Sequence, residues 1–87
     1  MNTAFILIAQ YDGKAVIPAK DVCRDYFQMS VDTMLRKVNK GEIRIPVVRM
    51  ERSQKCAKGI HVQDLAAYLD KRREEAMTEY LAGRSGG

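Results

Sequence analysis

The segment from Ser30 to Gly41 carries the strongest signal for local structure in this chain. Serine is a favourable helix N-cap because its hydroxyl accepts a hydrogen bond from a free backbone N–H of the first turn. Glycine is a favourable residue just after a helix, since it adopts the left-handed conformation that closes the last turn. Between these ends, apolar side chains recur at the spacing of one helix face, at Val31, Met34, Leu35 and Val38. The segment is therefore predicted to be a short amphipathic helix.

The other face of this helix is cationic and able to form hydrogen bonds. It carries, at the same spacing, Thr33, Arg36, Lys37 and Lys40. A helix that is held by one face and presents arginine and lysine on the other fits the major groove of DNA. Surface helices of many proteins are also charged on their outer face. The neighbouring segments must therefore decide between these two interpretations.

A second helix is predicted just before this one, from Pro18 to about Phe27. Proline suits the first helical position because no partner is needed there for the missing N–H. The apolar stripe of this helix consists of Ala19, Val22, Cys23 and Tyr26. Only Gln28 and Met29 separate the two helices, and the glycine that is frequent in such turns is absent. Two short helices joined by a tight turn form a helix-turn-helix unit, whose second helix enters the groove.

The segment after Gly41 has the pattern of a β-hairpin with a basic loop. Residues 43–50 (IRIPVVRM) predict a strand, and Pro46 makes it an edge strand or a bulged one because proline cannot donate to a ladder. Residues 51–59 form a polar, basic loop, and residues 60–62 predict the return strand, with His61 as an ordinary exposed strand residue. This layout after a helix-turn-helix is that of a wing, which follows the phosphate backbone or enters the minor groove. The alternative is a solvated hairpin tip.

The N-terminal part predicts further extended structure. The apolar run from residue 5 to residue 9 (FILIA) is short and rich in β-branched residues, which favours a buried strand. Asp12-Gly13 predicts a turn. Val16-Ile17 predicts a short extended piece, since the residue before a proline avoids the α region.

The C-terminal part predicts a long helix from Asp64 to about Leu81. This length exceeds what so small a core needs, so the far half of the helix is frayed or packs on a second copy, and we favour a dimer. We expect one domain over residues 1–82 and a flexible tail over residues 83–87. The predicted fold is α+β: a winged helix-turn-helix with a small antiparallel β-sheet and a long C-terminal helix.

The positive charge of the chain is concentrated in its middle third. The chain has a net charge of +4 and an isoelectric point of about 9.3, which suits a polyanionic partner. Residues 30–59 contain eight basic and three acidic residues, a balance of +5, whereas residues 1–29 balance to zero and residues 60–87 to −1. The excess charge therefore coincides with the second helix of the helix-turn-helix and with the wing.

Motifs for catalysis and metal binding are absent from the sequence. It contains no glycine-rich phosphate loop, no GxSxG, no HExxH and no carboxylate pair in an apolar setting. Cys23, Cys56 and His61 lack the spacing of metal ligands, and two cysteines form no disulfide framework. We therefore expect no enzymatic activity, no metal and no cofactor. We find neither a signal peptide nor a membrane span and expect a cytoplasmic protein.

The candidate DNA contacts form two groups. Those of the second helix, which would face the major groove, are Thr33, Arg36, Lys37 and Lys40. Among them, Arg36 is best suited to bidentate recognition of guanine. Those of the hairpin, where the cations would mainly neutralise phosphates and the polar residues add contacts, are Arg44, Arg49, Arg52, Ser53, Gln54, Lys55 and Lys58. Neutralising about five phosphates gives a slope of log K against log salt of roughly −4 to −5.

The assembled pattern resembles known families at two levels. The segment DVCRDYFQMSVDTMLRKVNKGEI, followed by a basic hairpin and by QDLAAYL, is similar to the excisionase and MerR-type winged helix-turn-helix domains. A closer resemblance, over about residues 2–77, is to the pyocin activator protein (PrtN) family. It rests on AQYDGKAVIP, VCRDYF, RKVNKGEIRIPVVRME and SQKCAKGIHVQDLAAYLDKRREEA. The segments SQKCAKG and KGIHVQDLAAY are its most specific part.

The resemblance implies a small DNA-binding transcriptional activator of phage-tail-like bacteriocin genes, or a prophage relative of one. Such proteins act on promoter-proximal repeats and are released from repression after DNA damage. An activator also needs a contact with RNA polymerase, for which the exposed charges of residues 70–75 are candidates. Two other functions stay open: an excisionase-like architectural protein that bends DNA for a recombinase, and an antirepressor-type interaction module that uses the basic wing on an acidic protein.

Overall fold

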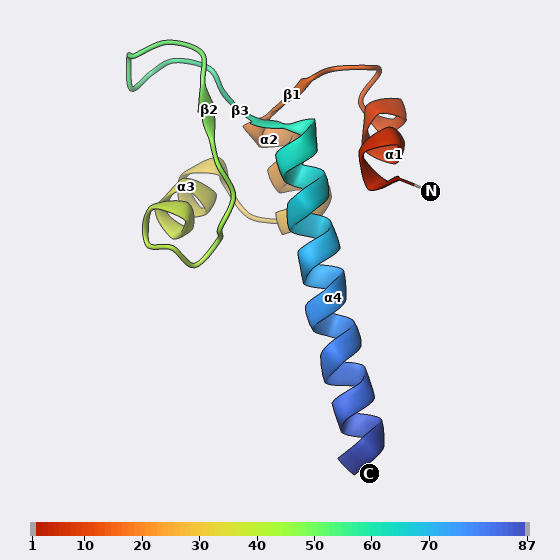
Figure 1. The fold of residues 1–87 in the computed structure, drawn as a ribbon. Coiled ribbons are helices and arrows are strands. Elements are labelled where there is room, and N and C mark those ends of the chain that lie inside the picture. The colour runs from red at the N-terminus through yellow and green to blue at the C-terminus, as the bar shows by residue number, and fades with distance from the viewer. Residues whose placement is uncertain (1, 87) are drawn as a thin grey trace.

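The chain folds as helices around a small sheet, with one long helix projecting from them. The computed structural model describes residues 2–86, with side chains described for residues 2–83. In chain order the elements are α1 (Thr3–Gln10), β1 (Val16–Pro18), α2 (Ala19–Val22), the π-helical segment η1 (Cys23–Phe27), α3 (Val31–Asn39), β2 (Val48–Arg49), β3 (Lys58–His61) and α4 (Val62–Gly86). Figure 1 shows α1 on one side of α4 and α3 on the other. The predicted α+β class is confirmed, with a small antiparallel sheet and a long C-terminal helix in a winged-helix-like arrangement.

The sheet has three short antiparallel strands in the order β1-β3-β2. The predicted extended piece at Val16-Ile17 is confirmed as β1. The predicted strand over residues 43–50 is wrong except at β2, which does lie at the edge of the sheet. Only Lys58 and Gly59 of β3 pair with β2, although β3 continues to His61 on the side of β1, so residues 43–47 do not join the sheet. Pro46 also lacks the N–H that a longer ladder would need.

Gly59 marks the closest approach of two strands. It is buried, and a Cβ at this position would lie 2.6 Å from Val16 Cγ1 and 2.7 Å from the Ile17 carbonyl oxygen. Because real Cβ atoms do not come so close to backbone, only glycine lets β3 pack against β1 here.

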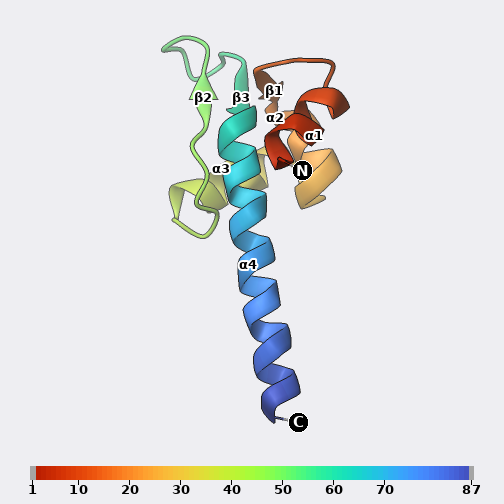
Figure 2. The same cartoon turned by 45° about the vertical axis from the view of Figure 1, so that its right-hand side comes forward.

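The predicted buried strand over residues 5–9 is wrong, because this segment lies in α1. The Asn2 side chain caps the helix by accepting a hydrogen bond from the Ala4 N–H at 2.7 Å. Of the large apolar side chains, Leu7 is 1% exposed, whereas Phe5 is 69% and Ile6 50% exposed. A continuous apolar run fits a buried strand and a helix equally well, and here the N-cap and the packing against α4 favour the helix (Figure 2).

Polar side chains join α1 to its neighbours. The Tyr11 hydroxyl, just after the helix, donates to Asp25 Oδ2 at 2.6 Å, and the Tyr26 hydroxyl donates to Gln10 Oε1 at 2.8 Å. Burial, followed by the hydrogen bond to Asp25, raises the pKa of Tyr11 well above its ordinary value. At the other end of α1, Thr3 Oγ1 donates to Asp70 Oδ1 at 2.6 Å. The turn predicted at Asp12-Gly13 is confirmed and returns the chain to β1.

One hydrophobic core joins the helices, the sheet and the first turns of α4. Its largest fully buried side chains are Leu7, Ile17, Val22, Met34, Ile60 and Leu65. Burying each of them stabilises the fold by roughly 1.5–3 kcal/mol. By contrast, residues 71–83 are all exposed, and the molecule is 51 Å long. Only the first half of α4 therefore contributes to the core.

The bounds of α4 differ from the prediction at both ends. His61 Nδ1 accepts a hydrogen bond from the Gln63 N–H at 3.0 Å, so the half-buried His61 caps the helix, which starts at Val62 rather than at Asp64. The helix continues to Gly86, through most of the segment expected to be a tail. Residue 87 of that segment lies outside the described residues.

Candidate nucleic-acid interface

The turn between the two short helices is tight, and a non-glycine residue closes the first of them. The predicted helix is confirmed over residues 19–27 as α2 and η1, with Ala19, Val22 and Cys23 buried as expected. Pro18, expected as its first residue, is instead the last residue of β1 and the N-cap of α2. Gln28 follows with φ of 53°, in the left-handed region. It therefore supplies the backbone conformation that a glycine commonly provides in such turns.

Both predicted ends of α3 are confirmed. Ser30 Oγ accepts a hydrogen bond from the Thr33 N–H at 3.1 Å. Gly41 has φ of 79°, its N–H donates to the Val38 carbonyl at 3.0 Å, and the next N–H donates to the Lys37 carbonyl at 2.9 Å. These two bonds form a Schellman motif. The helix is therefore fixed in length and direction by its own sequence.

The two faces of α3 are separated as predicted. Met34 is fully buried, and Val31, Leu35 and Val38 pack against the core. On the opposite face, Arg36 and Lys40 are exposed, while Thr33 and Lys37 are half-buried. Inside the fold, the Cys23 thiol donates to the Met34 sulfur at 3.4 Å, so α3 is seated directly on η1.

Residues 50–57, called the wing loop below, join β2 to β3 and carry exposed polar and basic side chains. The Met50 N–H donates to the Ala57 carbonyl at 3.0 Å and closes the base of the loop. Four consecutive residues predicted to contact DNA are exposed in it: Arg52, Ser53, Gln54 and Lys55. Ser53 Oγ also accepts from the Lys55 N–H at 3.1 Å, which forms a local turn.

Lys58 differs from the other cations of this region, because its ammonium group is directed into the loop. Its Nζ donates to the Gln54 carbonyl at 2.6 Å and to the Cys56 carbonyl at 3.3 Å. The side chain therefore links two backbone carbonyl groups of the wing loop. No feature of the sequence distinguishes this lysine from Lys55, since the difference depends on the path of the loop.

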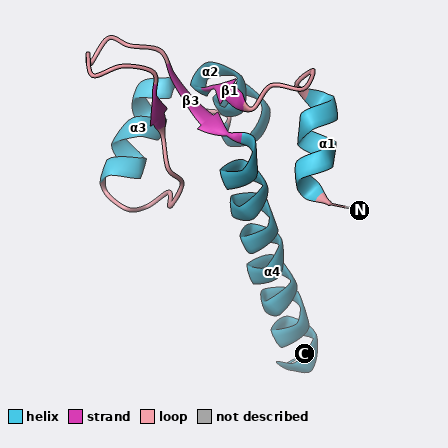
Figure 3. Cartoon of the chain, turned by 45° about the horizontal axis from the view of Figure 1, so that its top comes forward, coloured by secondary structure: helices cyan, strands magenta, loops and turns pink. Residues whose placement is uncertain are grey.

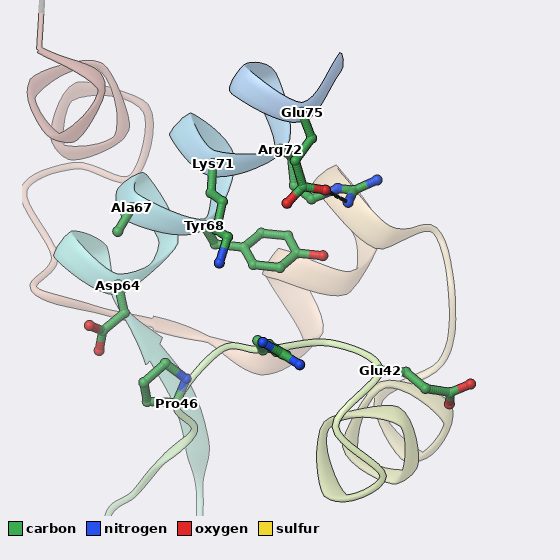
Figure 4. A pocket seen from close by; sticks show the side chains of 9 residues that line it. Glu42, Pro46, Asp64, Ala67, Tyr68, Lys71, Arg72 and Glu75 are labelled. Carbon is green, nitrogen blue, oxygen red and sulfur yellow. Dashed lines mark hydrogen bonds and ion pairs between the residues drawn. The ribbon is translucent and has the colours of Figure 1, made fainter. Parts of the chain in front are cut away.

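Arg44 also lies apart from the rest of the predicted contacts. It alternates with the buried Ile43 and Ile45 on the segment between α3 and β2, and it lines a pocket of about 380 Å³ against α4. The charged residues that line this pocket are Glu42, Arg44, Asp64, Lys71, Arg72 and Glu75. Figure 4 shows the Tyr68 ring across the middle of the pocket. With three cations and three anions, the lining of the pocket carries no net charge.

Helix α3 and the wing loop, which carry exposed cations, lie on one side of the molecule. Figures 1 and 3 show α3 and this loop together on the side opposite α1. In the part of the chain that the structure describes, the ion pairs join Arg24 to Asp21 and Asp25, and Arg72 to Glu75. None of them involves a basic residue between 30 and 59. Ion pairs among the described residues therefore leave the charge of this side unneutralised, and it attracts anions.

The three side chains considered as metal ligands are far from forming a site. Cys23 is buried against Met34, and burial raises its pKa. Cys56 lies in the wing loop, and His61 caps α4. Among residues 2–86, we find no group of three side chains suited to a metal ion, and no helix both long and apolar enough to cross a bilayer.

A comparison with protein families decides between the possible relatives of this chain. Residues 3–76 match the family model described as pyocin activator protein PrtN. The chain belongs to this family. Neither the comparison with curated proteins nor that with solved structures finds a match.

The match to the pyocin activator family covers the elements that carry the exposed cations. The matched residues include α3, the wing loop and the first half of α4. A family of activators has a regulatory role, which agrees with the absence of catalytic motifs in the sequence. The expected activation of pyocin or prophage genes is supported by the family match.

Proposed function

We propose that this chain activates pyocin or prophage genes by binding double-stranded DNA at specific promoter-proximal sites. The observation that supports this most strongly is the outer face of α3. This helix is capped at both ends, is held by Met34, and presents Arg36 and Lys40 without ionic partners. A rigid helix with free cations can enter the major groove, and its charges then replace the counterions of the phosphates.

The proposed contacts divide between base recognition and phosphate neutralisation. Arg36 recognises guanine through its planar guanidinium, and Thr33 adds a polar contact in the major groove. The residues assigned to phosphates are Lys37, Lys40, Arg49, Arg52 and Lys55. Ser53 and Gln54 contribute hydrogen bonds from the wing loop. Lys58 and Arg44 act indirectly, since one side chain shapes the loop and the other lines the pocket beside α4.

Binding to the DNA upstream of the adjacent operon tests the proposal. Fluorescence anisotropy over a series of salt concentrations is expected to give a slope of log K against log salt of roughly −4 to −5, from about five neutralised phosphates. Footprinting on the same DNA defines the site and its repeats, and half-sites roughly 34 Å apart indicate a two-fold dimer. The absence of duplex binding at low salt would contradict the proposal and favour an antirepressor-type protein. Bending without stimulated transcription would favour an excisionase-like one.

The division of labour between α3 and the wing loop has its own test. Arg36→Ala is expected to lower the affinity for the specific site by roughly 1–3 kcal/mol and to relax base preference at one position. Lys55→Ala is expected to weaken binding to all sequences about equally and to reduce the salt slope by about 1. Lys14→Ala removes an exposed cation far from α3 and serves as the control. Equal losses on random DNA for Arg36→Ala and Lys55→Ala would refute this division.

Lys58 provides a sharper comparison within the loop. If its ammonium holds the Gln54 and Cys56 carbonyls, Lys58→Met lowers affinity by loosening the loop but changes the salt slope much less than Lys55→Ala does. Amide hydrogen exchange should become faster in residues 52–57 of Lys58→Met and stay unchanged in Lys55→Ala. A full unit of lost slope with unchanged exchange would instead make Lys58 a phosphate contact.

Activation also requires contact with RNA polymerase, for which we propose the exposed charged stretch of α4 over residues 70–75. Its side chains project beyond the core, on an element other than α3 and the wing loop. Transcription in vitro with Lys71→Glu tests this assignment. DNA binding is expected to persist while activation is lost, and normal activation by this variant would contradict it.

A further inference from the structure

The outer face of α1 is an apolar surface that the fold leaves uncovered. Phe5 is 69% exposed, Ile6 50% and Ile8 37%, and the helix contains no charged residue. A helix that is apolar on every side is normally buried. Since only Leu7 of this helix is buried in the core of the chain itself, its remaining apolar side chains lack a partner.

Two further exposed apolar side chains lie on the side of α4 that faces α1. Asp70 accepts the hydrogen bond from Thr3, so its side of α4 faces α1. Met77 follows Asp70 by two helical turns and Leu81 by three, which places both on the same side of the helix. They are 46% and 52% exposed. The α1 face and these two side chains, called the α1–α4 patch below, comprise Phe5, Ile6, Ile8, Met77 and Leu81.

The size of the α1–α4 patch indicates an interface. Five large apolar side chains exposed to this extent present together on the order of 500 Å², a size at which exposed apolar patches are often functional. A specific interface buries about 800 Å² per partner once its polar rim is included. The patch therefore supplies the apolar centre of an interface of ordinary size.

We infer that a second copy of this chain covers the α1–α4 patch and forms a two-fold dimer. In a two-fold contact each residue lies near its own counterpart, so like charges in the contact would repel. The five patch side chains are uncharged, and the charged residues that line the hollow between α1 and α4, Asp70 and Arg73, have opposite signs, so a self-contact brings no net charge together. The patch also lies opposite α3 and the wing loop (Figures 1 and 3). A dimer formed here leaves both basic surfaces uncovered.

Sedimentation velocity of the full chain over a wide concentration range tests the inference. The wild-type chain is expected to be a dimer, and Phe5→Glu a monomer with an unchanged circular dichroism spectrum, because Phe5 is too exposed to support the core. Met50→Glu is the matched control, since Met50 is similarly exposed at 62% but is the first residue of the wing loop, away from α1. This variant should remain a dimer.

Three results would overturn the inference: a monomeric wild-type chain at every concentration, a dimeric Phe5→Glu, or a monomeric Met50→Glu. If Phe5→Glu does not fold, Phe5→Ala decides, because alanine is the best helix former. It should raise the dimer Kd by at least about tenfold, and an unchanged Kd refutes the interface. The proposed DNA binding fails separately, when an intact wild-type dimer binds no duplex.

Discussion

Helices α1 and α3 are similar in length, N-cap and buried residue, but their outer faces differ in chemical character. They contain eight and nine residues, and each has a side-chain N-cap and one buried residue, Leu7 in α1 and Met34 in α3. The outer face of α3 carries cations, whereas that of α1 carries Phe5 and Ile6. The caps and the buried side chain thus fix the ends of each helix and its position on the core. The core does not constrain the residues of the outer face, which can therefore be adapted to a partner.

The same difference explains why one helix was predicted from the sequence and the other was not. In α3 the polar outer face makes the apolar positions periodic, so the spacing identifies a helix. In α1 the outer face is also apolar, so the apolar residues no longer recur at helical spacing. An apolar run with β-branched residues then favours a strand, although the packing of α1 against α4 makes it a helix.

The largest effect is expected from the buried residue of each helix. Leu7→Ala and Met34→Ala should each lower the free energy of unfolding by about 2–5 kcal/mol, because both side chains are at most 1% exposed. Urea denaturation measures these losses. A loss below about 1 kcal/mol for Leu7→Ala alone would break the comparison, since α1 would then be only loosely attached.

A smaller effect is expected from the two N-caps. Asn2→Ala removes the acceptor of the Ala4 N–H, and Ser30→Ala removes the acceptor of the Thr33 N–H. Each should cost about 0.5–2 kcal/mol of stability, measured by thermal denaturation. Asn2→Asp and Ser30→Asp, which keep a capping oxygen, are the controls and should lose much less. Unequal effects of the two alanine variants would show that α1 and α3 depend differently on their first turns.

The smallest effect concerns the polar link of α1 to η1. The Arg24 guanidinium, followed by the Tyr11 hydroxyl, lowers the pKa of Asp25. A lowered carboxyl pKa in the folded state adds stability above the ordinary value of about 4 and loses it as the pH falls through the folded value. The melting temperature of the wild-type chain should therefore fall more steeply below about pH 4 than that of Asp25→Asn. Parallel curves would show that this link adds nothing to the attachment of α1.

Features with local causes could be predicted from the sequence. Ser30 and Gly41 fix the ends of α3 through their own backbone preferences, and Asp12-Gly13 does the same for the first turn. The hairpin with its basic loop and the helix pair also followed from local patterns. For the candidate site, the exposed cations of α3 and the wing loop were therefore named correctly as surface residues, and their contact with DNA stays a prediction.

Features with distant causes could not be predicted. Strand β2 is short because it pairs with β3 only at Lys58 and Gly59, although β3 itself runs on to His61. The role of Lys58 depends on the path of the loop, which brings the Gln54 and Cys56 carbonyls to its ammonium. Gln28 adopts a left-handed conformation that its residue type does not favour, because the chain must turn there between two packed helices.

The close packing of Gly59 on β1 has a consequence for variation among relatives. With this residue fixed against Val16, and with the Met50–Ala57 hydrogen bond closing the hairpin, the base of the loop is anchored independently of its tip. Insertions, deletions and exchanges between these anchor points leave the hydrophobic interior untouched. Residues 51–56 thus form an interchangeable module, in which new target preferences can arise, or be grafted, at little cost to folding.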